Sequence, residues 1–399
     1  MPGSVIVAGA RTPIGKLSGA LADFSAVDLG SKAIAAALER AGVAPENVDY
    51  VYMGHVVQAG AGQNPARQAA CGAGIPLTVP AATVNKVCLS GLNAIYLADQ
   101  MIAAGDADVV VAGGMESMTN APYLLPGARK GFRLGHTSLY DATNYDGLED
   151  ASSHEAMGAT SERDLPAFPG VSRERQDHWA AQSHERAAAA IKEGRLADEI
   201  VAVEVPQRRG EPLMVDNDEG VRPGTTVESL SRLRPAFAGD GTITAGNASQ
   251  ISDGACALVL MSPAAAERAA AERAAAAPLG RVVSYGQVAG PDTSLMTQPS
   301  RATHVALKKA ALGVGDVALF EWNEAFAAVV LASMDDLDVP GDRVNVNGGA
   351  VALGHPIGAT GARIALTLCH ELRRRGGGIG VAGLCGGGGQ GDALVVRAD

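Results

Sequence analysis

The sequence predicts an α/β protein built from two related halves, with helices layered on sheets that are substantially parallel. Short apolar runs such as Val5–Ala8 and Val48–Met53 are typical of buried strands, and between them Ala26–Ala41 has apolar residues at helical spacing. The same order of elements returns late in the chain. With 399 residues, 47% of them hydrophobic and 19% charged, the chain has enough apolar material for large cores.

The first elements define the repeated unit. The strand Val5–Ala8 leads into a turn at Arg11–Lys16, and the helix Ala26–Ala41 is expected to end at Gly42 before the strand Val48–Met53. Glycine is favoured just beyond a helix because it adopts positive φ without a steric penalty. Each unit therefore runs strand, helix, short linker and strand.

A second copy of the helix, linker and strand lies 269 residues further along the chain. Identical residues recur at that offset without a gap: Ala37, Leu38, Ala41 and Val48 return as Ala306, Leu307, Ala310 and Val317. Another pair of segments, Thr83–Gly114 and Val344–Gly383, also shares its order, and in both the last strand contains Val-Ala-Gly. Chance similarity between Ala-rich helices is the alternative, but the shared order of both repeats favours a duplication.

A stretch of different character separates the two copies. From Ser117 to about Ala248, proline, glycine, histidine and charged residues are spread through the sequence, which indicates a loop-rich insertion containing one helix at Ser172–Gly194. A strand is expected at Ile251–Met261 and a helix at Pro263–Ala277. The expected domains are an N-terminal half of residues 1–120 and 249–272, a loop domain of residues 121–248, and a C-terminal half of residues 273–399.

Composition narrows the class of partner and the compartment. The formal charge of −11 and the pI near 5.2 argue against nucleic acid or an anionic membrane as the main partner, since either would need a basic face. Five cysteines without a Cys-x-x-Cys pair support neither a disulfide framework nor a zinc site, so reduced thiols are expected. The N-terminus does not resemble a signal peptide, and we expect no apolar run of membrane-spanning length. These features predict a cytoplasmic protein.

Cys88 is the first candidate for chemistry. It lies in Asn85–Leu92, at the expected junction between a strand and a helix. A thiol at a helix N-terminus is near the positive end of the helix dipole, which favours the thiolate and predicts a lowered pKa. The alternative is a structural cysteine, because free cysteine is among the most buried residue types.

Two glycine-rich segments near the C-terminus contain the other candidates. His355 lies between Gly354 and Pro356, in a turn where an imidazole can serve as a base or an oxyanion donor, although a core histidine is the alternative. Cys385 precedes four glycines, which a strand does not need unless another group must approach its backbone. Asn323, followed by a glutamate, ends the repeated strand, with a helix cap as its alternative role.

Two thiols and an imidazole in tight turns fit the chemistry of a thioester. One thiolate can take up an acyl group, the other thiol can act as acid and base, and backbone N–H groups can stabilise the oxyanion at each carbonyl. A Gly-x-Gly-x-x-Gly pattern at Gly378, Gly380 and Gly383 is followed by a cysteine loop instead of a helix, so no dinucleotide site is implied. Neither a metal nor a redox cofactor is expected.

At these residues the chain resembles the thiolase family over essentially its whole length. The resemblance rests on segments distributed from end to end: Arg11–Gly15, Gly62–Gln68, the Cys88 segment, Gly113–Met118, Thr244–Ser249, Asn323–Phe326 and the two C-terminal loops. It implies a five-layered αβαβα fold made of two similar halves, a loop domain that covers a coenzyme A site, and a homotetramer built from dimers.

The resemblance also implies roles for individual residues. Cys88 is similar to the nucleophile that becomes acylated, His355 to the base that activates it, and Cys385 to the residue that removes the α-proton of the second acyl-CoA. His355 would form one oxyanion hole with a water held by Asn323, and the N–H groups of Cys88 and Gly387 would form the other. In coenzyme A binding, Arg222, Phe237 and Ser249 stand at matching positions, with Met157 near the pantetheine arm.

The implied activity is that of an acetyl-CoA C-acetyltransferase, which condenses two acetyl-CoA to acetoacetyl-CoA and coenzyme A in lipid metabolism. Family members of this kind often have histidine where this chain has Ala156, and a Met-Gly run where it has Ser294–Pro299. A longer-chain 3-ketoacyl-CoA thiolase of fatty-acid β-oxidation therefore remains the alternative. A ketoacyl synthase is disfavoured because Cys385 and Asn323 stand where it would have histidines, and a non-catalytic acyl-CoA or lipid binding protein is disfavoured by the retained reactive residues.

Overall fold

The computed structural model describes residues 3–272 and 277–399. The N-terminal half contains six strands and four helices: β1 Val5–Arg11, β2 Gly15–Lys16, α1 Ala26–Ala41, β3 Tyr50–Gly54, α2 Pro65–Gly72, β4 Ala81–Val84, α3 Ser90–Ala104, β5 Val109–Ser117, β10 Ser252–Met261 and α7 Pro263–Glu272. The C-terminal half contains β11 Gly280–Ala289, α8 Gln298–Lys309, β12 Leu319–Trp322, α9 Ala327–Leu337, α10 Ala350–Leu353, α11 Ile357–Arg374, β13 Gly378–Gly386 and β14 Gln390–Ala398.

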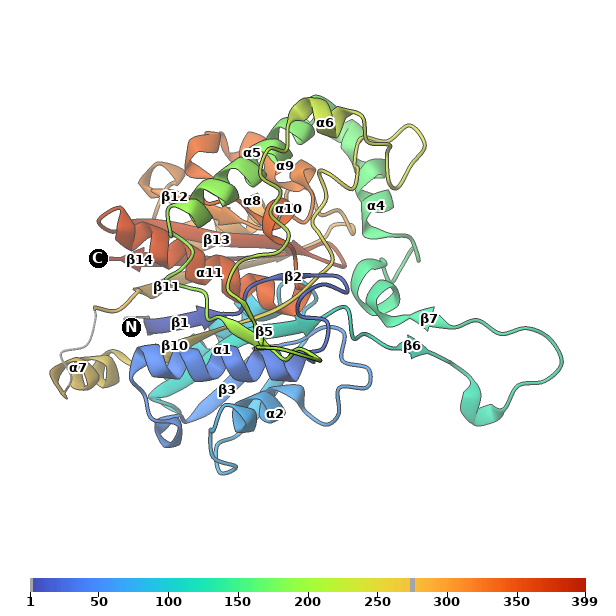
Figure 1. The fold of residues 1–399 in the computed structure, drawn as a ribbon. Coiled ribbons are helices and arrows are strands. Elements are labelled where there is room, and N and C mark those ends of the chain that lie inside the picture. Colours follow the sequence, from blue (N-terminus) through green and yellow to red (C-terminus); the bar gives the residue numbers. More distant parts are fainter. Residues whose placement is uncertain (1–2, 273–276) are drawn as a thin grey trace.

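The segment between β5 and β10 contains mostly short elements. They are β6 Tyr123–Leu124, β7 Tyr140–Asp141, a π-helical turn Thr143–Leu148, α4 Met157–Asp164, α5 Arg173–Lys192, β8 Val203–Val205, β9 Leu213–Val215 and α6 Val227–Ser231. Strands β6 and β7 begin a long hairpin that extends away from the body (Figure 1). Apart from α5, most of this segment consists of loops and turns.

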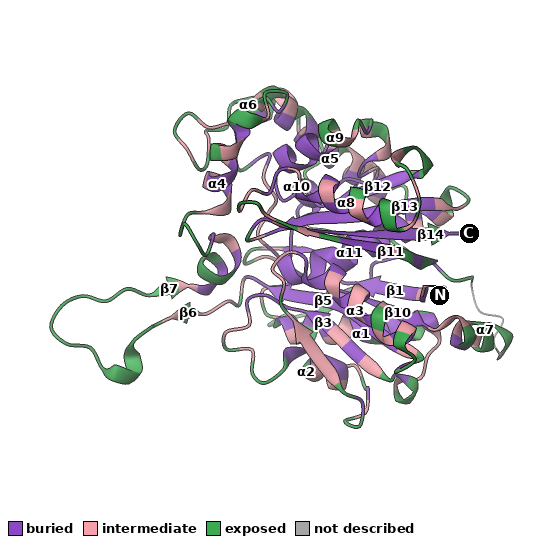
Figure 2. Ribbon diagram, turned by 180° about the vertical axis from the view of Figure 1, so that it is seen from behind, coloured by how far each residue is buried: buried purple, intermediate pink, exposed green. Residues whose placement is uncertain are grey.

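Five layers make up the body, which confirms the αβαβα expectation. Helices α1 and α2 cover the outer face of the N-terminal sheet, α8 and α9 cover the outer face of the C-terminal sheet, and α3 and α11 lie between the two sheets (Figure 1). One hydrophobic core surrounds the two central helices, and a further core lies under each outer layer. Buried residues accordingly fill both sheets and the central layer (Figure 2).

The two sheets repeat one strand order. In the N-terminal half the order is β4-β3-β5-β10-β1, and in the C-terminal half β12-β13-β14-β11, with an isolated parallel bridge from Phe320 to Val344 in the place of β4. The halves join where β1 pairs with the start of β11. The sheets are mixed, however, since among the strands that the structure describes only β3–β4, β3–β5 and β12–β13 pair in parallel. The expected predominance of parallel strands is therefore wrong, because β13 returns directly into β14 through a tight turn.

Several expected elements are present with shifted ends. The helix Ala26–Ala41 is confirmed, and Gly42 ends it with φ 61°. The strand predicted at Val5–Ala8 extends to Arg11, and Ser172 caps the helix of the insertion. The helix expected at Pro263–Ala277 is described as α7 over Pro263–Glu272. Residues 273–276 lie outside the described residues, as does the proposed domain boundary after residue 272.

Helix α3 corrects one expectation drawn from composition. Residues 87–104 are long and apolar enough to match a membrane span by length and composition. In the structure they contain α3, which packs against β3, β5 and α11 between the two sheets. A helix enclosed on several sides needs apolar residues around most of its circumference, which accounts for the composition.

Candidate active site

The candidate site forms where the two central helices begin. The N-terminal turns of α3 and α11 are in close contact, and glycine is required on both sides. A Cβ at Gly91 would lie 2.8 Å from the backbone nitrogen of Ala362, and a Cβ at Gly361 would collide with Leu92. The loops that precede these helices contain Cys88 and His355, so this packing brings one reactive residue from each half to the same end of the molecule.

The Cys88 loop is strained and strongly held. Val87 has φ 51°, an unfavourable conformation for a β-branched residue. The Val87 N–H donates to Asn85 Oδ1 at 3.0 Å, and the Ser90 hydroxyl donates to the Val87 carbonyl at 2.6 Å. Lys86 pairs with the buried Asp392 of β14 at 2.7 Å, which attaches the loop to the C-terminal half. The loop thus presents Cys88, which is half-buried, in a fixed position.

Cys385 reaches the same place from the end of β13. A Cβ at Gly386 would lie 2.6 Å from Leu89 Cγ, and one at Gly387 would lie 3.3 Å from Val87 Cγ1. The β13–β14 turn therefore packs directly on the Cys88 loop. The N–H groups of Gly387 and of Cys88 itself interact with the Cys88 thiol, and the proximity of the two sulfurs contributes to the raised pKa of Cys385.

Burial decides the protonation state of both thiols. It raises the pKa of the Cys88 thiol to about 12, although the backbone N–H groups of Gly387 and Cys88 oppose the shift. Burial also raises the pKa of Cys385, which is almost completely enclosed. The prediction that the helix dipole lowers the pKa of Cys88 is wrong for the free protein. Burial destabilises the thiolate by more than the helix dipole stabilises it. A base is therefore needed to generate the nucleophile.

His355 has the properties of that base. Its Nδ1 lies 2.7 Å from the hydroxyl of Thr360, which donates its own proton to the Pro356 carbonyl. Nδ1 is then the donor, and Nε2 is unprotonated and accepts from the Asn323 Nδ2–H group at 3.3 Å. Burial, and then the nearby Arg363, lower the pKa of His355 to about 3. The imidazole is accordingly neutral at physiological pH, with Nε2 as the nitrogen that can take up a proton.

The Asn323–Glu324 pair joins the site to the insertion. Asn323 is buried, and its Oδ1 has no hydrogen-bond partner among the described residues, so it is free to accept from a water. Glu324 accepts hydrogen bonds from Trp179 and Ser183 of α5, at 3.0 and 2.7 Å, and from Asn345 of the C-terminal half at 2.9 Å. Glu324 thus fixes α5 against the strand that ends at Asn323.

A cavity in the insertion lies against the start of α10. It has a volume of about 240 Å³ and is lined by Arg222 together with His184, Ser229, Leu230, Gly246 and Gln250. The His184 ring accepts a hydrogen bond from the Arg222 N–H at 3.2 Å. Arg222 is the one predicted coenzyme A residue in this lining, while Ser249 is adjacent to Gln250.

The remaining predicted binding residues lie near Ala325 and Phe326, just beyond Asn323 in the chain. Ser249 donates its backbone N–H to the Ala325 carbonyl at 3.0 Å, two residues from Asn323. Phe237 is partly exposed and packs edge-to-face on Phe326 at a centroid distance of 6.0 Å. Met157 begins α4 and packs on the same hydrophobic cluster as Phe326. All three residues are thus anchored close to the segment that follows Asn323.

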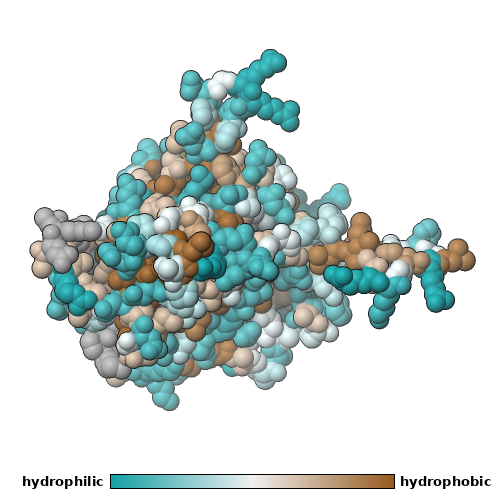
Figure 3. Space-filling view, turned by 90° about the horizontal axis from the view of Figure 1, so that it is seen from below, coloured by the Kyte–Doolittle hydropathy of each residue, from teal (hydrophilic) through white to brown (hydrophobic). Residues whose placement is uncertain are grey.

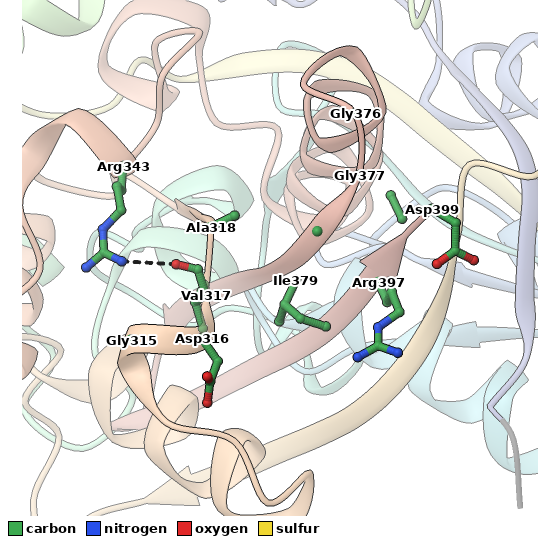
Figure 4. Close-up of a pocket in the computed structure, with 12 residues that line it drawn as sticks. Gly315, Asp316, Val317, Ala318, Arg343, Gly376, Gly377, Ile379, Arg397 and Asp399 are labelled. Carbon is green, nitrogen blue, oxygen red and sulfur yellow. Dashed lines mark hydrogen bonds between the residues drawn. The ribbon is translucent and has the colours of Figure 1, made fainter.

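A larger cavity of about 710 Å³ lies elsewhere (Figure 4). It is lined by residues at the opposite ends of β12 and β13 from Asn323 and Cys385, among them Arg343, Arg397 and Asp399. Arg343 is held there by donating to the Val317 carbonyl at 3.0 Å. None of the predicted site residues lines this cavity, so we do not assign it to the active site.

The structure therefore brings Cys88, Cys385 and Gly387 together, and it places His355 beside Asn323 at the start of α11, the helix that packs on the start of α3. Sequence reasoning missed Thr360, Val87 and the linking role of Glu324. Thr360 had a usable signal, since a hydroxyl in the first turn of the helix that follows His355 can reach back to that ring. The strain at Val87 had none, because it depends on the path of the backbone.

The chain belongs to the thiolase family. The family model described as "Thiolase, N-terminal domain" matches residues 4–264, and that described as "Thiolase, C-terminal domain" matches residues 276–398.

Its relatives are similar over their full lengths. The chain is 55% identical to a "Probable acetyl-CoA acetyltransferase" of Mycolicibacterium smegmatis, covering 98% of this chain and 100% of that one. It is 51% identical to an acetyl-CoA acetyltransferase of Pseudomonas aeruginosa, covering 99% of each. The crystal structure of the Bacillus anthracis acetyl-CoA acetyltransferase superposes with a TM-score of 0.95 at 42% identity, covering 100% of this chain and 99% of that one.

Proposed function

We propose that this thiolase is an acetyl-CoA C-acetyltransferase, which catalyses the reversible Claisen condensation of two acetyl-CoA to acetoacetyl-CoA and coenzyme A. The observation that carries the proposal is the meeting of two thiols from different halves at the start of α3, with a neutral imidazole just before the start of the helix α11 that packs on it. One thiol can hold an acyl group while the other moves a proton at the second substrate. The full-length relatives named acetyl-CoA acetyltransferase support acetyl-CoA as the substrate over longer acyl chains.

In the first half-reaction the acetyl group moves to Cys88. His355 Nε2 takes the thiol proton as the sulfur attacks the thioester carbonyl, and the N–H groups of Cys88 and Gly387 stabilise the oxyanion of the tetrahedral intermediate. The carbon–sulfur bond to coenzyme A then breaks, and the departing thiolate receives the proton from His355. Acetyl-Cys88 and free coenzyme A result.

In the second half-reaction Cys385 acts as a thiolate, formed by loss of its proton to solvent, and removes a proton from the methyl group of a second acetyl-CoA. His355 and a water bound to Asn323 stabilise the enolate oxygen, and the carbanion attacks the acetyl carbonyl on Cys88. The Cys88 sulfur leaves as acetoacetyl-CoA forms and takes the proton held by Cys385, which restores the Cys88 thiol and the Cys385 thiolate. Donation from His355 Nε2 requires the other tautomer, which the Thr360 hydroxyl permits because it can either donate to or accept from Nδ1.

Binding of the thioester is assigned to a path along the insertion. Arg222 and the cavity it lines would hold the coenzyme A end, with Ser249, Phe237 and Met157 along the pantetheine arm toward Cys88. These residues supply a base, an acid and oxyanion donors without recourse to a metal or a redox cofactor, so we propose that the reaction needs neither.

The exposed hairpin supports self-association. Its apolar side chains face solvent, with Tyr123 67%, Phe132 49% and Leu134 fully exposed. The space-filling view shows a projecting arm that carries both hydrophobic and hydrophilic residues (Figure 3). Large exposed apolar groups are typical of interaction sites. We propose that the arms join subunits in a homotetramer, measurable by light scattering, and that the enzyme acts in cytoplasmic lipid metabolism.

Mass spectrometry of the protein after incubation with acetyl-CoA tests the activity. One acetyl group is expected on Cys88, none in Cys88→Ala, and unchanged labelling in the control Cys71→Ala, which alters a cysteine on the outer helix α2. Thiolysis of 3-ketoacyl-CoA of increasing length should fall beyond four carbons. An unlabelled Cys88 would contradict the proposed reaction, and a flat or rising series would replace acetyl-CoA with longer substrates.

A further inference from the structure

Glu116 ends β5 as a fully buried carboxylate with an unusual set of donors. Its Oε2 accepts from the N–H groups of Val56 and Gly358 at 3.0 and 2.9 Å, and its Oε1 accepts from the N–H of Val57 at 3.1 Å. The ring of His55 lies 3.3 Å from Oε1. The carboxylate therefore links the loop after β3 to the first turn of α11, an element of the other half.

Helix α11 depends on this contact. Pro356, the residue before its first turn, makes no side-chain cap, and a helix begins with N–H groups that have no partner within the helix. Glu116 satisfies one of them at Gly358, and a carboxylate at that position is favoured by the helix dipole. His355 lies directly before Pro356, so the contact that fixes the start of α11 also fixes the imidazole.

The duplication shows what is special about this residue. Strands β5 and β13 occupy equivalent places in the two sheets, with Gly113 and Gly383, 270 residues apart, both aligned with their neighbouring strands. At the same offset Glu116 corresponds to Gly386, whose lack of a side chain lets the turn rest on Leu89 of the Cys88 loop. In the C-terminal half, Gly386 therefore leaves the end of β13 without a side chain beside α3. In the N-terminal half, Glu116 places a carboxylate near the end of β5 beside α11.

We propose that Glu116 is a positioning residue that holds His355 in place by reaching from β5 to the first turn of α11. The inference rests on the proposed function for its kinetic readout.

The hydrogen bonds of Glu116 and the length of its side chain, rather than a fixed negative charge, hold the start of α11 in place. Burial raises the pKa of Glu116 to about 7, opposed by its three N–H donors, and its titratable neighbours are His55, Asp253 and Cys88. Burial lowers the pKa of His55 to about 4, so that ring is neutral. A glutamine can keep its amide oxygen on the Val56 and Gly358 N–H groups and donate an amide hydrogen to the neutral ring, so that it loses only the bond from the Val57 N–H.

Variants that separate length from charge test the proposal. Glu116→Asp keeps the charge but withdraws it by one methylene, and Glu116→Ala removes the contact, so single-turnover acetylation of Cys88 should slow at least about 30-fold in both. Glu116→Gln should stay within about 5-fold of wild type. KM for acetyl-CoA should change little in all three, since the Arg222 cavity is not touched. Asp253→Asn is the matched control, because that buried carboxylate of β10 bonds to Thr119 and not to α11.

A second readout does not require activity. Hydrogen exchange in the peptide containing residues 356–361 should be faster in Glu116→Asp than in Glu116→Gln or Asp253→Asn. Fast acetylation in Glu116→Asp and slow acetylation in Glu116→Gln would show that charge acts instead of side-chain length, and would overturn the proposal. Unchanged hydrogen exchange and acetylation in Glu116→Asp would also overturn it. Failure of wild type to acetylate Cys88 would instead refute the proposed function, and the exchange result would still decide the role of Glu116.

Discussion

The two halves of the molecule differ most in how equivalent strands are joined. In the C-terminal half, β13 and β14 are connected by Gly387–Gly389 alone, and the turn places Cys385 and the Gly387 N–H on the Cys88 loop. In the N-terminal half, the equivalent strands β5 and β10 are separated by residues 118–251, which supply α5, the Arg222 cavity and the exposed hairpin. The duplicated halves are thus joined differently, and the proposed function places chemistry at the short connection and substrate binding at the long one.

The same contrast separates the two thiols. Cys88 is half-buried in a strained loop that backbone N–H groups face, whereas Cys385 is buried at a strand end beside it. The first is accessible to an acyl donor, and the second can act only on a group brought to it.

Replacing Cys385 should have the largest effect on activity, and it tests whether the two thiols act in separate steps. Cys385→Ala should still form acetyl-Cys88, because the nucleophile and its base remain, but exchange of the acetyl-CoA methyl protons with deuterated water should slow about 10³-fold, since its acid and base is lost. Peptide mass spectrometry and proton NMR measure the two steps. Normal exchange in this variant would assign proton transfer to another residue.

The pH dependence of alkylation tests the protonation of Cys88. With a thiol pKa of about 12, the thiolate fraction and the rate of modification by iodoacetamide should rise about tenfold per pH unit between pH 7 and pH 9. Cys88→Ala identifies the modified peptide as the control. A plateau within that range would mean that the helix dipole outweighs burial after all.

The β13–β14 turn and the long segment between β5 and β10 should also differ in how much an added side chain lowers the free energy of unfolding. Gly389 has φ 66° and its Cβ would collide with the Asp292 carbonyl, so Gly389→Ala should cost about 3 kcal/mol or more. Gly210 in the insertion has φ 88° but no atom within 4 Å of its Cβ position, so Gly210→Ala should cost about 1 kcal/mol. Urea unfolding of both variants measures the difference. Equal losses would remove the distinction between a rigid turn and a permissive loop.

Local signals predicted much of the fold. Helix α1 ends where expected because Gly42 can adopt the left-handed conformation, and the duplication was visible because buried positions recur at a constant offset. The direction of the strands was not visible in the same way, since β13 turns straight back into the antiparallel β14 although substantially parallel sheets were expected. A short apolar strand has the same composition in either direction.

The site was predictable where chemistry requires unusual residues in unusual backbone. Cys88, His355 and Cys385 stood out through their glycine-rich surroundings or their position before a helix. The pKa of Cys88 was not predictable, because it depends on how many atoms of the C-terminal half surround the loop. Glu116 stood in a recognisable segment, but its contact with Gly358 joins residues 242 apart in the chain, which no local pattern reports.

Treatment with 1,3-dibromoacetone at pH 9, followed by peptide mass spectrometry, asks most directly whether the two halves meet at one reaction centre. The reagent joins two thiols only when they are a few ångströms apart. We expect a single link between the peptides containing Cys88 and Cys385, and we expect prior acetylation of Cys88 to prevent it. Separate modification of the two cysteines, or a link from Cys88 to any other cysteine, would contradict it.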